Sequence, residues 1–361
     1  MTAGTIRKLD TNETTKISKL LSQQFSNKVV GQKAAPTKLV EIFDAYTAGL
    51  VNPRHPAGTV LFLGPTGTGK THVVEMFAES MFGNASAYVR IDCAEFQHSH
   101  EIAKLIGSPP GYLGHRETKP ALSQEYLNKY HTESLKFSIV LFDEIEKASD
   151  ALWSLLLGIL DNATVTLGDN TKVDFSKSVI IMTTNLGSRE MANRGIGFVE
   201  PSALVDDARM SKIAISAARS KFSPEFMNRI QHTVVFKTLT VEQITQVLEM
   251  ELYKLNMQLF TASSYQVGLP RFCIKVSPAA KRTLIEEGFD ARYGARHINR
   301  AIESRIQVPL ARLLGSQQIT HGDEVIVDDS GKEVFDFYVR SLAPVPPVLL
   351  TKMEGHYNEN Q

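Results

Sequence analysis

Apolar runs alternate with helix-like stretches over the first two thirds of the chain. The runs are TVLFL (59–63), AYVRID (87–92), FSIVLF (137–142), SVIIMT (178–183) and TVVF (233–236). Nearly continuous apolar strands separated by helices are typical of a parallel sheet that is covered on both faces. The pattern therefore predicts an α/β domain built on a five-stranded parallel sheet.

After residue 236 the pattern becomes mostly helical. The stretch TVEQITQVLEMELYKLNMQLF begins at Thr240, which we expect to cap a helix, and Ser277 is expected to cap a later one. The runs CIKV and DEVIVDD are strand candidates. At 361 residues the chain exceeds the usual size of one hydrophobic core, so we expect a second, smaller domain here.

The two ends of the chain are polar. Near the start, apolar side chains recur at helical spacing at Ile17, Leu20, Leu21 and Phe25, which predicts a short amphipathic lead-in helix. The end is Pro-rich and then polar, which predicts a flexible tail. The expected division is an N-terminal extension (1–28), a large α/β domain (29–236), a smaller, mostly helical domain (237–340) and the tail (341–361).

Composition and charge narrow the class of protein. Hydrophobic residues make up 43% of the chain, and Lys+Arg balance Asp+Glu at 39 each. This balance argues against a protein that binds nucleic acid through a broad basic face. The distant cysteines, Cys93 and Cys273, indicate neither a disulfide framework nor a zinc module. Because no signal-peptide pattern occurs and no apolar run approaches the ~18 residues of a membrane span, we expect a cytoplasmic protein.

A phosphate-binding loop follows the first apolar run. In LFLGPTGTGKTHVVEMF a strand leads into a glycine-rich turn and then a helix, which is the context that this motif requires. Its amides suit phosphates, Lys70 should reach the β- and γ-phosphates, and the Thr71 hydroxyl should bind Mg2+. The expected cofactors are ATP and Mg2+, held by Gly64, Pro65, Thr66, Gly67, Thr68, Gly69, Lys70 and Thr71.

Polar side chains end two further apolar runs. After FSIVLF, Asp143 is expected to hold the Mg2+ shell and Glu144 to activate the attacking water. Acidic residues also favour helix starts, so this assignment depends on the neighbouring phosphate loop. After SVIIMTT, the amide of Asn185 could orient the water or sense the γ-phosphate, although Asn after a strand is more often a turn former.

Several motifs in a fixed order resemble those of a known family. The phosphate loop, FDEIEKA, IMTTNLGS, FSPEFMNRI and FDARYGARHINR, together with VVGQ (29–32), are similar to the motifs of Clp-type AAA+ protein unfoldases, particularly the second AAA+ module of ClpA, ClpB and ClpC. The resemblance covers about residues 28 to 330. It implies an AAA+ P-loop NTPase with a helical lid domain, and a Mg-dependent ATPase that drives protein unfolding. Because motifs of a first module and an N-terminal substrate domain are not found in the sequence, we expect a stand-alone, single-module form.

The resemblance also implies roles for single residues. Val29 and Val30 would line the adenine pocket, Arg229 would be an arginine finger for a neighbouring subunit's ATP, and Arg296 would be the small domain's sensor arginine. Fixed positive charge near the transferred phosphoryl group lowers the barrier to this reaction. A finger that acts in trans requires a closed ring, which in this family is a homo-hexamer. Without the resemblance, a surface salt bridge explains Arg229 equally well.

An aromatic side chain lies between glycines in GSPPGYLGHRE (107–117). By resemblance, Tyr112 and Leu113 would grip an extended polypeptide in the ring channel, and an aromatic face packs against varied side chains. The alternative is an ordinary loop aromatic that packs back on its own domain. From His115 onward the segment departs from the family's usual GYEEGG, which puts the charge of the channel entrance and the choice of substrate in doubt.

An apolar tripeptide, Ile196, Gly197 and Phe198, lies in the long connection between Asn185 and FSPEF. Exposed apolar tips are costly without a partner. In ClpA, ClpC and ClpX a similar tripeptide docks the ClpP peptidase ring, so the resemblance implies a ClpP-like peptidase as a partner. The alternative is that both apolar side chains fold back onto their own domain.

The leading interpretation is a remodeller that threads unfolded or misfolded polypeptides and has no membrane partner. One alternative is a ring that switches shape with ATP and binds a partner without threading it. Another is a nucleic-acid motor, which the neutral charge weakens. A metal site in DCAEFQHSHE is also conceivable, but the ligand spacing is irregular, and a polar connection between strand and helix is preferred. Its candidate ligands are Asp92, Cys93, Glu95, His98 and His100.

Overall fold

The computed structural model describes residues 10, 14–108, 120–188, 203–265, 270–288, 296–332 and 334–341. The chain divides into two compact units, Met1–Thr238 and Leu239–Gln361. The first unit contains two hydrophobic cores, one on each face of a sheet, and the second unit contains its own core. Within the described ranges, no helix is both long enough and apolar enough to cross a membrane.

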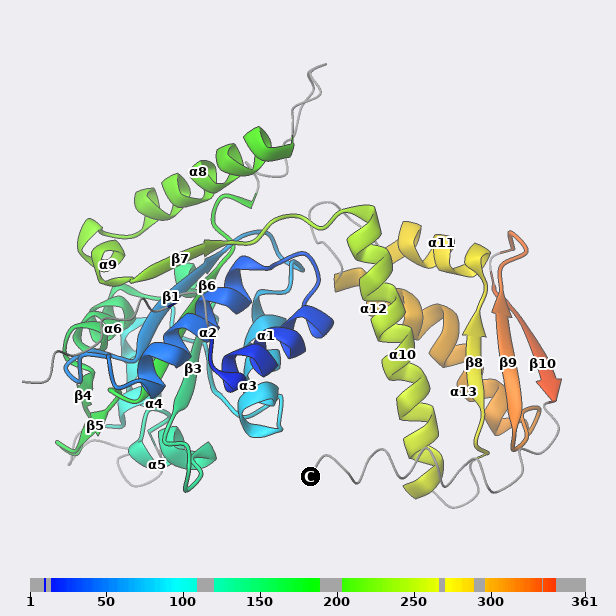
Figure 1. Cartoon of the computed structure of the whole chain (residues 1–361), viewed down its shortest axis with the longest axis horizontal. Coiled ribbons are helices and arrows are strands. Elements are labelled where there is room, and N and C mark those ends of the chain that lie inside the picture. Colours follow the sequence, from blue (N-terminus) through cyan, green and yellow to red (C-terminus); the bar gives the residue numbers. More distant parts are fainter. Residues whose placement is uncertain are drawn as a thin grey trace, which may run out of the picture. The chain divides into compact units, whose positions relative to one another are not determined.

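A five-stranded parallel sheet forms the centre of the first unit (Figure 1). Its strands are β1 (Gly58–Leu63), β2 (Val89–Asp92), β3 (Ser138–Asp143), β6 (Ser178–Thr184) and β7 (His232–Val235). They lie in the order β2-β3-β6-β1-β7, and all neighbours run parallel. Every residue of β1, β3 and β6 is buried, which explains the continuous apolar runs. The sheet predicted from those runs is confirmed.

Helices cover both faces of this sheet. The helices of one face are α1 (Lys16–Lys28), α2 (Ala34–Thr47) and α3 (Lys70–Phe82). Those of the other face are α6 (Asp150–Asn162), α8 (Ala203–Lys221) and α9 (Pro224–Arg229). Successive side chains of a strand alternate between the two faces, so Phe62 packs under α3 while its neighbour Leu61 packs in the opposite core.

The lead-in helix predicted near the N-terminus is α1. Leu21 and Phe25 are buried, and the Phe25 ring stacks on Phe77 with 6.0 Å between centroids. Ile17 and Leu20, by contrast, are 56% and 58% exposed, so half of the expected apolar positions do not reach the core. Because burying one large apolar side chain contributes roughly 1.5–3 kcal/mol, Leu21 and Phe25 anchor α1 firmly to the first unit.

Short elements connect the strands of the first unit. They are η1 (Cys93–Glu95), η2 (Ser99–Ile102), α4 (Ala103–Ile106), α5 (Gln124–Leu127), η3 (Asn128–Tyr130), η4 (Ile145–Lys147) and the hairpin of β4 (Thr164–Thr166) and β5 (Lys172–Asp174). The sequence pattern does not predict this hairpin, because three-residue strands carry almost no periodicity.

The second unit combines helices with a three-stranded sheet. Its elements are α10 (Val241–Tyr265), β8 (Cys273–Val276), α11 (Pro278–Gly288), α12 (Arg296–Ile302), η5 (Glu303–Gln307), α13 (Val308–Gly315), β9 (Asp323–Asp328) and β10 (Asp336–Ser341). Strand β9 pairs with β8 in parallel and with β10 antiparallel. The expected caps are present: Gln243 N donates to Thr240 Oγ1 at 3.3 Å and Ala280 N to Ser277 Oγ at 3.1 Å. Strand β10 is not predicted.

Candidate nucleotide-binding site

The glycine-rich loop lies between β1 and α3, at the carboxyl edge of the sheet. Gly64 and Gly69 have φ values of 151° and 94°, which favour glycine. At Gly64 the requirement is also steric, since a Cβ there would lie 2.6 Å from the carbonyl oxygen of Phe236. Thr68 Oγ1 donates to the carbonyl of Pro65 at 2.8 Å and closes the turn. The loop therefore presents the N-terminus of α3, where free N–H groups and the helix dipole favour phosphate.

Lys70 begins α3, and its ammonium group is buried inside the loop. Its Nζ donates to the carbonyl oxygens of Gly64 at 2.7 Å and Pro65 at 2.9 Å, and to Asn185 Oδ1 at 2.8 Å. Burial lowers the pKa of Lys70 from 10.5 to about 8, and neighbouring carboxylates, first of all Glu146, oppose this change. Because its three acceptors are uncharged, an anionic phosphate would be a stronger partner for this cation.

Asp143 ends β3 and is bonded to both neighbouring strands. Thr183 Oγ1 of β6 donates to Asp143 Oδ1 at 2.5 Å, and Arg90 Nη2 of β2 donates to Asp143 Oδ2 at 2.7 Å. The residue is only 8% exposed. Each carboxylate oxygen keeps a further lone pair for another ligand. The two strands thus fix the direction in which this carboxylate can bind a cation.

Glu144 follows Asp143 in an unusual backbone conformation. Its φ of 57° and ψ of 50° are left-handed, which costs a non-glycine residue on the order of 1 kcal/mol and is concentrated at functional sites. The Glu144 N–H donates to Thr183 Oγ1 at 3.0 Å. The carboxylate accepts a hydrogen bond from Asn185 Nδ2 at 3.1 Å and forms an ion pair with Lys147. The turn therefore brings this carboxylate to the end of β6.

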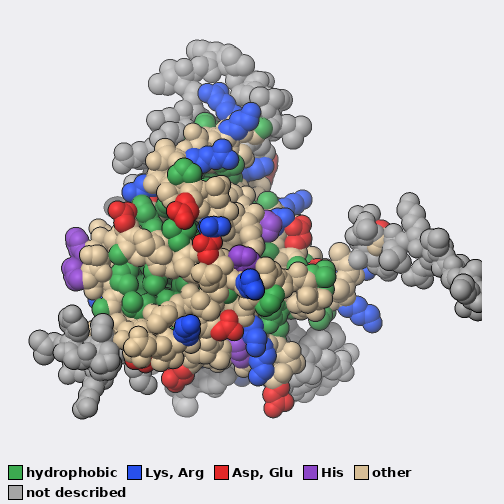
Figure 2. All heavy atoms as spheres, turned by 90° about the vertical axis from the view of Figure 1, so that its left-hand side faces the viewer, with side chains coloured by type: hydrophobic (Ala, Val, Ile, Leu, Met, Phe, Trp, Pro, Cys, Tyr) green, Lys and Arg blue, Asp and Glu red, His purple; other side chains and the backbone are tan. Residues whose placement is uncertain are grey.

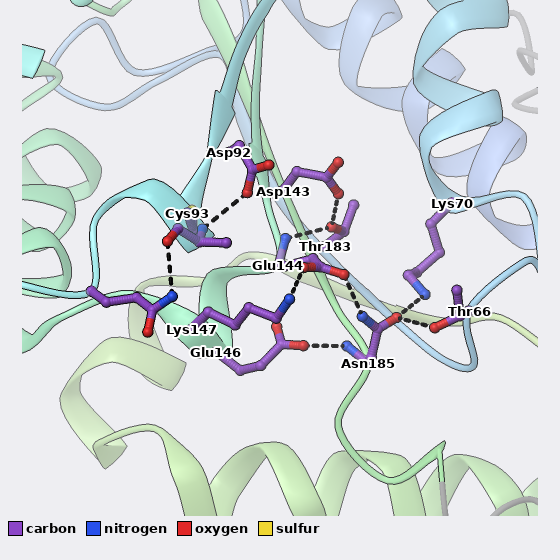
Figure 3. Close-up of polar contacts among 12 residues, drawn as sticks. Thr66, Lys70, Asp92, Cys93, Asp143, Glu144, Glu146, Lys147, Thr183 and Asn185 are labelled. Atoms are coloured by element: carbon purple, nitrogen blue, oxygen red, sulfur yellow. Dashed lines mark hydrogen bonds and ion pairs between the residues drawn. The ribbon is translucent and has the colours of Figure 1, made fainter.

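Asn185 lies at the centre of the site, directly after β6 (Figure 3). Its Oδ1 accepts hydrogen bonds from Lys70 and, at 3.4 Å, from Thr66 Oγ1, while its Nδ2 donates to Glu144. Its backbone N–H donates to Glu146 Oε1 at 3.0 Å. One amide side chain therefore joins the phosphate-loop lysine to the carboxylate that follows β3.

The donor set of the site fits Mg2+. The Thr71 hydroxyl, in the first turn of α3, and the Asp143 carboxylate are the hard oxygen ligands that this ion prefers. No cluster of three His, Cys, Asp or Glu able to hold a metal occurs in the described ranges, and Mg2+ usually needs only one or two protein ligands besides substrate phosphates and water. Elsewhere in the site, Glu146 Oε2 is buried without a hydrogen-bond donor among the described residues.

The segment that follows α1 lies beside the first turn of α3. Val29 and Val30 are partly buried, and Val29 packs against the core under α1, α2 and α3. The carbonyl oxygen of Lys28 lies 3.1 Å from His72 Nε2 of α3. Val29, one of the two valines that the family resemblance assigns to the adenine pocket, therefore packs near α3, the helix that follows the phosphate loop.

Other candidate residues are not brought into this cluster. Arg229 Nε lies 2.6 Å from Asp161 Oδ1 and its side chain is 45% exposed, so within one chain it forms the surface salt bridge named as the alternative. Arg296 begins α12 in the second unit, and its side chain lies outside the described residues. The same is true of the channel pair Tyr112 and Leu113 and of the tripeptide Ile196, Gly197 and Phe198.

The segment DCAEFQHSHE forms two short capped helices. Asp92 caps η1 by accepting the Ala94 N–H at 2.9 Å, and the rings of His98 and His100 stack with 5.7 Å between centroids. Cys93 is fully buried, and this burial strongly raises the pKa of its thiol. The segment thus connects β2 to α4, and Cys93 is not a reactive thiolate.

Four residues of the site are not predicted by the sequence reasoning: Arg90, Glu146, Lys147 and Thr183. Glu146 and Lys147 lie within FDEIEKA, and their position just after the predicted acidic pair could have indicated that they belong to the site. The other two depend on which strands become neighbours of β3, and one sequence does not reveal the order of strands in a parallel sheet.

The sheet order, the phosphate loop, the acidic pair after β3 and the asparagine after β6 define an AAA+ nucleotide-binding domain. Family models agree: residues 55–233 match the AAA domain of the Cdc48 subfamily, and residues 239–327 match the C-terminal, D2-small domain of ClpB. A nucleotide-binding domain is thus followed by the small domain that ClpB carries.

The sequences of individual relatives identify the family to which the chain belongs. The ATP-dependent Clp protease ATP-binding subunit ClpC of Staphylococcus saprophyticus is 37% identical over 314 residues, which are 87% of this chain and 36% of the relative. ClpC of Staphylococcus aureus strain USA300 is 37% identical over 322 residues, 88% of this chain and 38% of that protein. The chain belongs to the Clp family of AAA+ ATPases. It spans little more than a third of the length of these relatives.

Solved structures share the fold. Hsp104 in a closed state with ATPγS and FITC casein superposes with a TM-score of 0.74 at 28% identity, over 89% of this chain and 51% of that chain. The extended conformation of the Saccharomyces cerevisiae Hsp104:casein complex gives 0.75 at 26% identity, over 90% and 53%. The predicted α/β class, an AAA+ domain followed by a smaller domain, is confirmed.

Proposed function

We propose that this chain hydrolyses ATP with Mg2+ and uses the energy to thread polypeptide through a ring. The observation that carries the proposal is the hydrogen-bonded path from Lys70 through Asn185 to Glu144, with Asp143 held beside it. A cation, a polar sensor and two differently held carboxylates at one sheet edge are what phosphoryl transfer requires.

Each residue of the path has a distinct task. The phosphate loop and Lys70 bind the phosphates, and Thr71 and Asp143 hold Mg2+, which when bound neutralises charge on the phosphates. Glu144 accepts the proton of the attacking water at its carboxylate. Asn185 orients Glu144 and distinguishes a nucleotide that has a γ-phosphate from one that lacks it. Val29 and Val30 contact the adenine, and Arg296 acts as the sensor arginine of the small domain.

Arg229 completes the site of a neighbouring copy in a hexameric ring. Arg229 lies at the end of α9, and its half-exposed guanidinium pairs with the partly buried Asp161, a partner that it can exchange for a stronger anion. Assays should mix Arg229→Ala with Glu144→Gln, each inactive alone. If finger and base act in trans, mixed rings contain some intact interfaces and ATP hydrolysis reappears. If rings exchange subunits and no activity returns, the trans role is wrong.

Threading is assigned to Tyr112 and Leu113, by the family resemblance and because the structural relatives were solved with casein. A disordered polypeptide should stimulate ATP hydrolysis by the wild type. Tyr112→Ala should abolish the stimulation and keep basal hydrolysis, while Tyr126→Ala, a control at a tyrosine that is 51% exposed, should keep both. Stimulation that survives Tyr112→Ala would instead support the ring that switches without threading.

A ClpP-like peptidase is the proposed partner for Ile196, Gly197 and Phe198, because these residues resemble the docking tripeptide and the ClpC relatives are subunits of a Clp protease. ATP-dependent degradation of an unfolded substrate should occur with such a peptidase and fail with Phe198→Ala. Phe260→Ala, a control at an exposed phenylalanine of α10, should degrade normally. Equal degradation by both variants would end the docking proposal and leave remodelling alone.

Surface charge does not favour the nucleic-acid motor. On the face shown in Figure 2, some lysine and arginine side chains gather near the top, while over the rest of the face they lie among acidic ones. The formal net charge is +0. Salt-dependent binding to DNA, which requires clustered phosphate contacts, is the observation that would revive this function.

A further inference from the structure

Glu146 has no part in the proposed chemistry, although it lies within the site. It belongs to η4, two residues after the proposed general base. Its Oε1 accepts the backbone N–H of Asn185 at 3.0 Å, and Figure 3 shows the carboxylate directed at that amide. The other oxygen, Oε2, is buried and receives no hydrogen bond from any described residue.

This contact is made at the residue where β6 ends. The strand closes at Thr184, whose carbonyl accepts Gly64 N at 3.2 Å, and the next residue leaves the sheet ladder. A backbone N–H at that position needs a partner from outside the sheet. Glu146 supplies it with a charged acceptor, and hydrogen bonds to charged groups are about twice as strong as neutral ones.

The direction of the Asn185 side chain depends on this backbone anchor. Its Oδ1 lies 2.8 Å from Lys70 Nζ and its Nδ2 lies 3.1 Å from Glu144 Oε1, so two bonds in different directions fix one short side chain. A side chain with only two rotatable bonds cannot keep both contacts if its backbone turns. Burying a carboxylate with one oxygen unpaired is also costly, which is a reason to expect a function for it.

We infer that Glu146 is a positioning residue that holds the backbone of Asn185, so that the Asn185 side chain can respond to the γ-phosphate. The inference rests on the proposed function, because it presupposes that Asn185 distinguishes the two nucleotides. It adds a residue of η4 that touches neither the nucleotide nor the reacting water. It acts on Asn185 through one hydrogen bond, which is distinct from its electrostatic effect on the pKa of Lys70.

The test measures the ratio of affinities for a non-hydrolysable ATP analogue and for ADP, alongside ATP hydrolysis. Asn185→Ala should reduce this ratio roughly tenfold, the loss expected from one hydrogen bond to a charged group. Glu146→Ala should reduce it equally, and the double variant no further. Glu146→Gln keeps an acceptor oxygen of the same reach and should keep most of the ratio. Glu95→Ala, at an exposed glutamate, is the control.

Glu146→Asp is a second variant that is less disruptive to folding, because it keeps the negative charge and only shortens the side chain that contacts Asn185. In Glu146→Asp the ratio of the two affinities should fall as far as it does in Glu146→Ala. A wild-type ratio in Glu146→Asp and Glu146→Ala, with the ratio lost in Asn185→Ala, would overturn the inference and leave the proposed function standing. Additive losses in the double variant would also overturn it. A wild-type ratio in Asn185→Ala itself would refute the sensing role and the inference together.

Discussion

Nucleotide binding should weaken at alkaline pH because the cation that meets the phosphates is already half-titrated at about pH 8. Lys70 is 8% exposed, and burial lowers its pKa from 10.5 to about 8. A bound phosphate would favour the ammonium form, so binding above pH 8 requires proton uptake. The dissociation constant should therefore rise roughly 25-fold between about pH 7.5 and 9.5, and the rise approaches tenfold per pH unit only well above pH 8.

The assay is a titration with a fluorescent ADP in that pH range, where the phosphates themselves do not titrate. Lys70→Met is the matched control: it should bind weakly, but with an affinity that hardly changes with pH. The lowered pKa of Lys70 also makes the free energy of unfolding depend on pH. Between pH 8 and 10.5 the unfolded chain holds the extra proton, so the free energy of unfolding should rise with pH by about 3 kcal/mol relative to Lys70→Met. A wild-type affinity that is flat to about pH 9.5 would refute the reasoning.

Three further predictions follow from single contacts. Gly64→Ala should lower the free energy of unfolding by about 2–4 kcal/mol and abolish nucleotide binding, because its Cβ would lie 2.6 Å from the carbonyl of Phe236; normal binding would contradict this. Arg90→Gln removes a positive charge beside Asp143, so the Mg2+ concentration for half-maximal nucleotide binding should fall roughly 2–5-fold; a higher requirement would show that Arg90 mainly orients the carboxylate. Phe25→Ala should cost about 3–5 kcal/mol in chemical denaturation, whereas an unchanged midpoint would mean that α1 is dispensable.

Much of the fold followed from the sequence because the central strands are buried on both faces. A run such as SVIIMT carries its own signal, and the strand β6 that it forms differs from the predicted range by one residue. Strand β10 has no such signal, because four of its six residues are exposed and its sequence is mixed. The two-stranded hairpin of β4 and β5 is too short for any periodicity.

The residues of the candidate site also fall into those that the sequence predicts and those that it does not. Lys70, Asp143 and Asn185 could be found because each belongs to a recognisable motif at the carboxyl end of a strand, and parallel strands bring these ends to one edge. Arg90 could not be found, because its role depends on β2 being the neighbour of β3. The anchor that Glu146 provides depends on the backbone turn at Glu144, whose left-handed conformation has no sequence signature.

The most direct measurement of the central claim compares wild type and Glu144→Gln for Mg-ATP binding and ATP hydrolysis on the same preparations. The account predicts that both bind Mg-ATP with similar affinity, since Lys70, Thr71 and Asp143 remain. It also predicts that hydrolysis by Glu144→Gln falls by about 10²–10⁴-fold, the usual contribution of a general base. Hydrolysis at the wild-type rate in the variant, or wild-type protein that binds ATP and never hydrolyses it, would contradict the account.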